Sequence, residues 1–271
     1  MSLALAGVGY RYAGEREPAI IGIELELAGG EIAGVAGPSE SGKSTLCLVA
    51  AGLAPRAIGG LLRGRLRIDG ADVDAWPMHR LSQHVGIGFQ SPATQLSQVA
   101  GTVFEEVAFG PMNLALPRDE VLARTWDALD ALRIGDLAER DPRRLSGGQQ
   151  QLLALAGLLA LRPGHLVLDE PTAQLDPEGT LLVVDALARL AASGVGILVA
   201  EQKTDVLAAL ASRTVVLDRG RVALSGPTAQ VLADARLPEV GVTPPAAVRL
   251  RTAWVAAGLR LADVEGALAR A

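Results

Sequence analysis

One stretch of the sequence constrains the fold more than any other. It consists of Gly37, Pro38, Ser39, Glu40, Ser41, Gly42, Lys43, Ser44 and Thr45. The stretch follows the apolar run 32–36 and leads into the apolar run 46–51, so it joins a predicted strand to a predicted helix. In this context the pattern G-x-x-x-x-G-K-[ST] predicts a phosphate-binding loop and not an ordinary glycine turn.

The residue types in this loop suit phosphate for separate reasons. Gly37 and Gly42 allow backbone turns that other residues resist. Successive N–H groups then point into one concavity, and the positive end of the following helix dipole lies at the same place. Lys43 adds a positive charge for the β- and γ-phosphates, and the Ser44 hydroxyl is a ligand for Mg²⁺.

Composition narrows the class of protein. The chain has 271 residues, enough for one large domain or two small ones, and 49% of them are apolar. Its net charge of −5 argues against a protein that binds nucleic acid through phosphate contacts. Its one cysteine, Cys47, excludes a disulfide within the chain and fits a reducing compartment.

Neither a signal peptide nor a membrane span is expected. The first residues lack a basic segment followed by an apolar core. The longest apolar run, 152–161, is shorter than the roughly 20 residues that cross a bilayer. We expect a cytosolic protein, or one held at a membrane through a partner.

Hydrophobic patterns predict alternating strands and helices. Strands are expected at 3–12, 19–27, 32–36, 65–70, 85–89, 165–170, 196–200, 214–217 and 221–224, and 55–64 reads as a glycine-rich connection. Helices are expected at 46–51, 118–133, 150–161, 177–192 and 246–270. This alternation predicts an α/β fold with a mainly parallel sheet and helices on both faces.

Prolines divide the chain further. Residues 91–145, punctuated by prolines, predict an inserted helical subdomain. Pro238, Pro244 and Pro245 mark a boundary. We expect a main domain over 1–235 and a short helical C-terminal extension over 236–271.

Two further motifs carry chemistry. Asp169 and Glu170 end an apolar strand, where the first carboxylate can hold Mg²⁺ through water and the second can polarise a water for attack on the γ-phosphate. Residues 145–149 read Leu-Ser-Gly-Gly-Gln, which is a serine-capped helix start. Ser146, two glycines and a helix N-terminus also make a second phosphate site.

The order and spacing of these motifs, together with Gln90, resemble the ATP-binding cassette (ABC) ATPases over about residues 1–235. The resemblance implies a P-loop NTPase fold with an antiparallel β subdomain beside the mainly parallel sheet. It also implies ATP and Mg²⁺ as ligands. In that family two cassettes pair head to tail, and each ATP lies between the phosphate loop of one cassette and the Ser-Gly-Gly element of the other.

The resemblance also implies roles for single residues. Tyr12 matches the aromatic residue that stacks on adenine, with Tyr10 as the alternative, and Gln90 matches the glutamine that contacts Mg²⁺ and the attacking water. Ser146 and Gly148 match the groups that contact the ATP of the partner cassette. By the same match, Asp169 coordinates the metal with Ser44 and Gln90, and Glu170 is the catalytic base. Residues 173–176 resemble the loop through which the cassettes sense each other.

Two residues depart from the family pattern. Glu40 stands where a small residue is usual, and we expect its carboxylate to face solvent or a basic partner because its charge repels a triphosphate. Gln202 stands where the family has a histidine that contacts the γ-phosphate. A glutamine amide donates a hydrogen bond but carries no proton or positive charge, so we predict slower or altered hydrolysis.

Residues 89–96 and 103–111 resemble the energy-coupling factor (ECF) group, the ATPase subunits of vitamin and transition-metal importers. This resemblance implies that 91–111 form a groove for a transmembrane subunit, and that the protein lies peripherally on the cytoplasmic face of a membrane. A generic import ATPase would present a similar surface.

Two other functions stay open. One is a weakly hydrolysing cassette paired with an unlike partner, which Gln202 favours and Glu170 opposes. The other is a soluble ABC ATPase of DNA repair or translation. The acidic charge and the short interval between Gln90 and Leu145, which cannot hold a long coiled coil, disfavour it.

Overall fold

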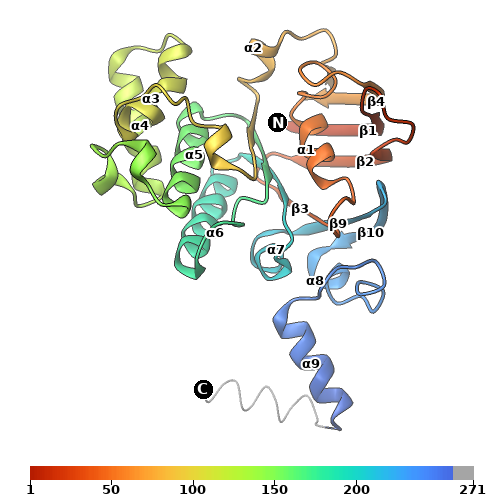
Figure 1. The fold of residues 1–271 in the computed structure, drawn as a ribbon. Coiled ribbons are helices and arrows are strands. Elements are labelled where there is room, and N and C mark those ends of the chain that lie inside the picture. Colours follow the sequence, from red (N-terminus) through yellow and green to blue (C-terminus); the bar gives the residue numbers. More distant parts are fainter. Residues whose placement is uncertain (259–271) are drawn as a thin grey trace.

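The computed structural model describes residues 1–258, and its strands form two sheets (Figure 1). The smaller sheet is antiparallel, with the order β2-β1-β4-β5. Its strands are β1 (Ser2–Arg11), β2 (Ile20–Ala28), β4 (Leu61–Ile68) and β5 (Ala71–Asp72). Alternation in β2 buries Ile23, Leu25 and Leu27 on one face and exposes the residues between them, as expected for a sheet with one solvated face.

One sequence expectation about this sheet was wrong. The segment 55–64 was expected to be a connection, but β4 begins at Leu61. Its first residues pair with Gly9, Tyr10 and Arg11 of β1, so a long-range ladder forms them into strand. Gly64 interrupts the alternating pattern that would have predicted this strand. It has φ +77° and lies near a shift in the β1–β4 register.

The larger sheet has the order β10-β9-β3-β8-β7-β6 and is mainly parallel, as predicted. Its strands are β3 (Ile32–Ala36), β6 (Val85–Gly88), β7 (His165–Asp169), β8 (Gly196–Ala200), β9 (Arg213–Asp218) and β10 (Arg221–Pro227). Only β10 runs antiparallel, as a hairpin partner of β9. Every residue of β3, β7 and β8 is buried, because helices or the second sheet cover both faces.

Helix α1 (Lys43–Ala50) lies between the two sheets and buries Leu46 and Cys47 there. On the opposite face of the larger sheet, α5 (Gly147–Leu161), α6 (Pro177–Ala192) and α7 (Thr204–Leu210) contribute to a second apolar cluster. A helix was expected over 46–51, but α1 begins at Lys43, so its first turn belongs to the phosphate-loop motif.

A group of helices stands to one side of the sheets (Figure 1). Helix α3 (Val103–Asn113) packs against α4 (Arg118–Ala131) and α5, while α2 (Met78–Leu81) is a single short turn near the antiparallel sheet. The sequence pattern did not predict α3, because Gly110 and Pro111 weaken its last turn. Its start is nonetheless marked by the capping box of Thr102 and Glu105.

Beyond β10, the chain continues through α8 (Thr228–Val231) to α9 (Ala246–Ala256). Leu237 and Val242 are buried, and Asp205 accepts a hydrogen bond from the backbone N–H of Ala246 at 2.8 Å. The predicted helix 246–270 is described only up to residue 258, and its remainder lies outside the described residues. No helix within 1–258 has the length and apolar character of a membrane span.

Candidate functional site

The loop 37–42 connects β3 to α1 at the carboxyl end of the parallel sheet. Gly37 has φ +156°, and a Cβ there would lie 2.4 Å from Ser41 Oγ and 2.5 Å from the Leu217 carbonyl oxygen. Gly42 precedes the first turn of α1 with φ +103°. Only glycine fits both positions, so the loop can place its N–H groups at the N-terminus of α1.

Lys43 lies inside this loop and is 5% exposed. Its Nζ donates hydrogen bonds to the carbonyl oxygens of Gly37 (2.8 Å) and Pro38 (2.9 Å). Burial lowers the pKa of Lys43, and the nearby carboxylates of Glu170 and Asp169 act in the opposite direction. The ammonium group is therefore held over the loop, next to the acidic strand end.

Glu40 is exposed at the outer turn of the loop, as expected from its charge. Its φ of +63° places it in the left-handed region, which costs a residue with a side chain roughly 1–2 kcal/mol. The carboxylate thus sits at a backbone position that glycine would occupy without strain.

Asp169, the last residue of β7, is 8% exposed. Burial raises the pKa of this carboxyl, and a hydrogen bond from Ser44 partly offsets that rise. Within residues 1–258, its Oδ1 is a buried oxygen without a hydrogen-bond partner. A buried, unpaired carboxylate oxygen beside a serine hydroxyl is a donor set that fits Mg²⁺, which prefers oxygen ligands.

Glu170 is held between two glutamines. Gln90, which follows β6, donates from Nε2 to Glu170 Oε2 at 2.8 Å. Gln202, which follows β8, donates from Nε2 to Glu170 Oε1 at 2.7 Å. The structure therefore brings Gln90, Glu170 and Gln202 together from three separate strand ends, and both oxygens of the carboxylate are engaged.

The two candidate aromatic residues differ in accessibility. Tyr10 is 1% exposed, and its hydroxyl donates to the carbonyl oxygen of Gly59. Tyr12 is half-buried and its hydroxyl lies 3.1 Å from Thr45 Oγ1, at the first turn of α1. The two rings meet edge to face, with centroids 5.0 Å apart. Tyr12 is thus the aromatic that borders the phosphate loop.

Ser146 and Gly148 lie elsewhere in the molecule. The Ser146 hydroxyl accepts from the Gln149 N–H at 3.3 Å, and the Gln149 side chain accepts from the Ser146 N–H, which caps α5 as predicted. Beside them is a cavity of about 410 Å³ that is lined by residues of α5 and of 174–182. None of the residues that line it belongs to the loop 37–45. One chain therefore holds the two predicted phosphate elements apart.

The segment 91–111 borders a groove of about 320 Å³ between the helical group and the sheets. Gln95 fixes one wall, because its side chain accepts from the Phe89 N–H at 3.0 Å and donates to the Ile87 carbonyl at 3.3 Å. Phe109 lines the groove and is 45% exposed, and Met112 on the same helix is 64% exposed. This surface is apolar although it faces solvent in the single chain.

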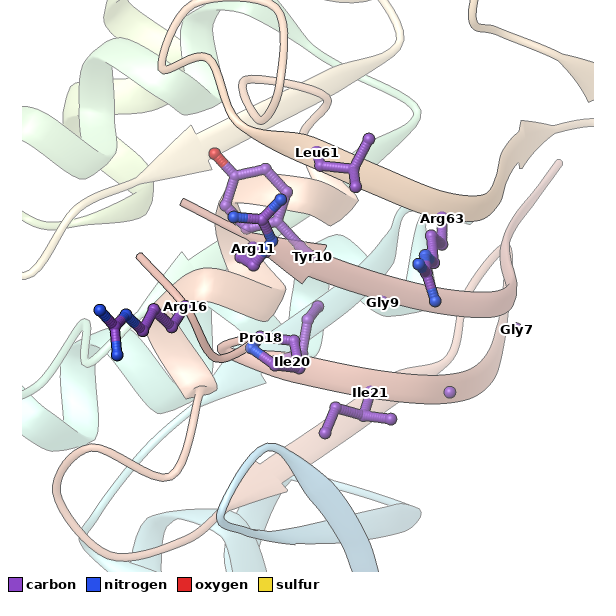
Figure 2. Close-up of a pocket in the computed structure, with 11 residues that line it drawn as sticks. Gly7, Gly9, Tyr10, Arg11, Arg16, Pro18, Ile20, Ile21, Leu61 and Arg63 are labelled. Carbon is purple, nitrogen blue, oxygen red and sulfur yellow. The ribbon is translucent and has the colours of Figure 1, made fainter. Parts of the chain in front are cut away.

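A different pocket, of about 410 Å³, lies on the antiparallel sheet (Figure 2). Arg11, Arg16 and Arg63 are among its lining residues, but their guanidinium groups lie apart along its rim and do not converge on one point (Figure 2). Of the predicted site residues, only Tyr10 lines it. We therefore assign the candidate site to the strand ends and the loop 37–45.

Sequence reasoning missed one group at this site. Glu201 is 1% exposed and accepts from Thr172 Oγ1 at 2.6 Å and from the backbone N–H groups of Gln202 (2.9 Å) and Lys203 (3.1 Å). Lys203 Nζ donates to the Thr172 carbonyl at 2.7 Å. The sequence did carry a signal for Glu201, because this acid directly follows a fully apolar strand. A carboxylate buried there requires hydrogen-bond donors around it.

Comparisons with known proteins show the family to which the chain belongs. The family model described as ABC transporter matches residues 20–173. A Pyrococcus horikoshii protein, named as an ABC transporter ATP-binding protein, is 41% identical over 245 residues, which cover 90% of this chain and 86% of that protein. The energy-coupling factor transporter ATP-binding protein EcfA of Methanosarcina acetivorans is 38% identical, with 92% and 88% covered.

Two solved structures extend the comparison. The cbiO1 protein of Clostridium perfringens, described as part of the ABC transporter complex cbiONQ, has a TM-score of 0.76 and 31% identity, covering 88% of this chain and 96% of that one. A dimeric ATP-binding cassette in a post-hydrolysis state, bound to ADP and Pi, has a TM-score of 0.73 and 26% identity, covering 83% and 98%.

Proposed function

Because this chain belongs to the ABC transporter family and is an ATPase of that family, we propose that it powers an ECF-type membrane transporter that takes up a vitamin or a transition metal. The similarity to EcfA and to cbiO1 supports this subfamily. The main support for the mechanism is that Gln90 and Gln202 each donate a hydrogen bond to one oxygen of the Glu170 carboxylate.

In the proposed mechanism, the loop 37–45 binds the phosphates of ATP. Its N–H groups at the start of α1 attract the anion, and Lys43 exchanges its carbonyl partners in the loop for phosphate oxygens. Tyr12 stacks on the adenine, since it is the accessible aromatic beside Thr45. Glu40 stays outside the phosphate cradle because it is exposed.

Glu170 acts as the general base that takes a proton from the attacking water. Gln90 and Gln202 orient its carboxylate through their amide N–H groups. Ser44, Gln90 and Asp169 are the residues that would hold Mg²⁺, as the unpaired Oδ1 of Asp169 suggests. When bound, Mg²⁺ supplies charge neutralisation for the phosphate oxygens.

We assign the second phosphate element to a partner cassette. Ser146 and Gly148 border a cavity that the loop 37–45 of the same chain does not line, so in a head-to-tail pair they would contact the ATP of the partner. The loop 173–176 would lie at this interface, since Gln174, Leu175 and Asp176 line the same cavity. The similarity to a dimeric cassette supports this arrangement.

The groove along 91–111 is the proposed contact for a transmembrane subunit. Its apolar lining and the exposed Phe109 suit burial against an apolar helix. Such a contact would place the protein peripherally on the cytoplasmic face of the membrane. In this scheme residues 1–235 form the nucleotide-binding domain, and 236–271 form the C-terminal extension.

Gln202 favours a second candidate, a cassette that hydrolyses weakly beside a more active, unlike partner. Its neutral amide contacts Glu170 and offers no positive charge for a phosphate. The replacement Gln202→His distinguishes the two. A higher ATPase rate in this variant supports the damped cassette, whereas an unchanged or lower rate supports a site adapted to glutamine.

Steady-state ATPase activity of the purified chain tests the proposed mechanism of hydrolysis. Glu170→Gln should abolish the activity, because the amide cannot accept the proton from water. Glu24→Gln, the same change at an exposed residue of β2 in the antiparallel sheet, should leave the rate unchanged. Full activity in Glu170→Gln would refute the assigned base.

A further inference from the structure

We propose that Glu201 and Thr172 are positioning residues that hold Gln202 against Glu170. This inference rests on the proposed role of Glu170. Within residues 1–258, the side-chain hydrogen bonds of Glu201 and Thr172 join them to each other and to the backbone of Gln202 and Lys203, while the Glu201 charge also raises the pKa of Lys43. Thr172 carries no charge and its hydroxyl donates to Glu201, so we expect it to act on the reaction through the turn that carries Gln202.

The contact between Glu170 and Gln202 forms beyond the ends of two paired strands. Strands β7 and β8 run parallel, and their last register pair is Asp169 with Ala200. The final backbone bond is from the Glu170 N–H to the Ala200 carbonyl oxygen, at 2.8 Å. After this point no ladder aligns the two segments, and side chains must do so.

Three side-chain contacts join the segments 170–172 and 201–203. Gln202 Nε2 meets Glu170 Oε1 at 2.7 Å, Thr172 Oγ1 meets Glu201 Oε2 at 2.6 Å, and Lys203 Nζ meets the Thr172 carbonyl oxygen at 2.7 Å. The contact of Glu201 with Thr172 is the innermost, since the two residues are 1% and 0% exposed. Solvent therefore does not compete for it.

Glu201 also fixes the backbone that carries Gln202. Its Oε1 accepts from the N–H groups of Gln202 and Lys203, at 2.9 and 3.1 Å. One carboxylate thus sets the turn after β8 with one oxygen and ties that turn to Thr172 with the other. A buried carboxylate with three donors is satisfied, and removing one donor leaves it partly unpaired.

The replacement Thr172→Val tests the proposal because it keeps the shape of the side chain and removes the donor. We expect kcat for ATP to fall about tenfold, the rate equivalent of one hydrogen bond to a charged group. KM should stay within about twofold, because the phosphate loop is untouched. Thr172→Ser, which keeps the hydroxyl, should recover most of the lost rate. Thr125→Val on α4 is the matched control, because it removes the hydroxyl of a buried threonine that donates to the Val121 carbonyl oxygen of its own helix, and it should keep the wild-type rate.

A double-mutant cycle separates positioning from a structural effect. In a Gln202→Ala background no amide remains to be positioned, so adding Thr172→Val should lower kcat little further. An equal loss in both backgrounds would mean that Thr172 acts by another route and would overturn the proposal. An unchanged kcat in Thr172→Val, with Glu170→Gln inactive, would overturn it while leaving the proposed function intact. If Glu170→Gln keeps full activity, both fail together.

Hydrogen–deuterium exchange gives a readout that needs no turnover. The amides of Gln202 and Lys203 donate to Glu201, so Thr172→Val should speed their exchange and leave the loop 37–45 unchanged. Unaltered exchange at both amides would contradict the proposal even if the isolated chain does not hydrolyse ATP.

Discussion

At the residue scale, Asp169 and Glu170 are neighbours with opposite surroundings. The buried Oδ1 of Asp169 has no hydrogen-bond partner within residues 1–258, whereas both oxygens of Glu170 accept from glutamine amides. An unsatisfied buried oxygen suits a cation, and a doubly held carboxylate suits a fixed base. The sequence placed both acids at a strand end, but it did not reveal this difference.

Glu40 is the clearest case of local strain in the phosphate loop. Because its φ is +63°, Glu40→Gly should stabilise the chain by about 1 kcal/mol, and thermal unfolding should shift upward by roughly 2–4 °C. Glu40→Ala removes the same charge but keeps a Cβ, so it should not gain this stability. Equal gains in both variants would show that charge, and not backbone conformation, is responsible.

At the element scale, local side-chain caps mark where several helices begin. Helix α6 begins at Pro177 and ends at Ala192, as predicted, with Asp176 accepting from the Gly179 N–H at 2.7 Å. Helix α5 begins at the capping box of Ser146 and Gln149. Such signals are local, because a side chain satisfies backbone N–H groups two or three residues away.

The capping box of α3 makes a quantitative test. Thr102 Oγ1 accepts from the Glu105 N–H at 3.1 Å, and Glu105 accepts in return from the Thr102 N–H at 3.2 Å. Thr102→Ala should lower the free energy of unfolding by about 1 kcal/mol, measured by urea denaturation. Thr102→Ser keeps the acceptor and should cost less. A loss of the same size in both variants would contradict a capping role.

At the scale of the whole molecule, the site exists because parallel strands end at one edge. The loop after β3 and the residues after β6, β7 and β8 meet there, which is where open α/β sheets place their ligands. Two apolar clusters hold this edge in place. One packs α1 between the sheets, and the other packs α5, α6 and α7 on the far face.

His165 links this packing to pH. It is 1% exposed, and both ring nitrogens lack a partner within the described part of the chain. Burial is the main cause that lowers its pKa; Asp69 opposes this, the N-terminus adds to it, and His84 acts in both directions. The folded state therefore binds this proton less readily than the unfolded state does. The contribution of neutral His165 to the free energy of unfolding is therefore present above about pH 6.5, the pKa of histidine in the unfolded chain. It is lost as the pH falls below that value.

The replacement His165→Val tests this prediction. The difference in unfolding free energy between wild type and variant should change by up to about 1.4 kcal/mol per pH unit below pH 6.5, to the disadvantage of wild type. His79→Gln, at an exposed residue, should follow wild type across the same range. A difference that does not vary with pH would show that His165 is not the group responsible.

The sequence by itself determined the parts of this protein that depend on short spacings. The glycine turn before α1, the serine cap at 146 and the acidic strand end were readable because each is built within a few neighbouring residues. The mainly parallel sheet followed from the alternation of elements. Most strand and helix bounds were off by only a few residues, because hydrogen bonds at the ends depend on the partner strand.

Only the tertiary structure decided which distant side chains meet. Pairing with β1 makes Leu61 the first residue of β4. The fold also brings Tyr12, and not Tyr10, next to Thr45 at the first turn of α1. It also joined Glu170 to Gln202 and Thr172 to Glu201 across two strand ends. These contacts are set by sheet order and register, which bring together residues that lie far apart in the chain.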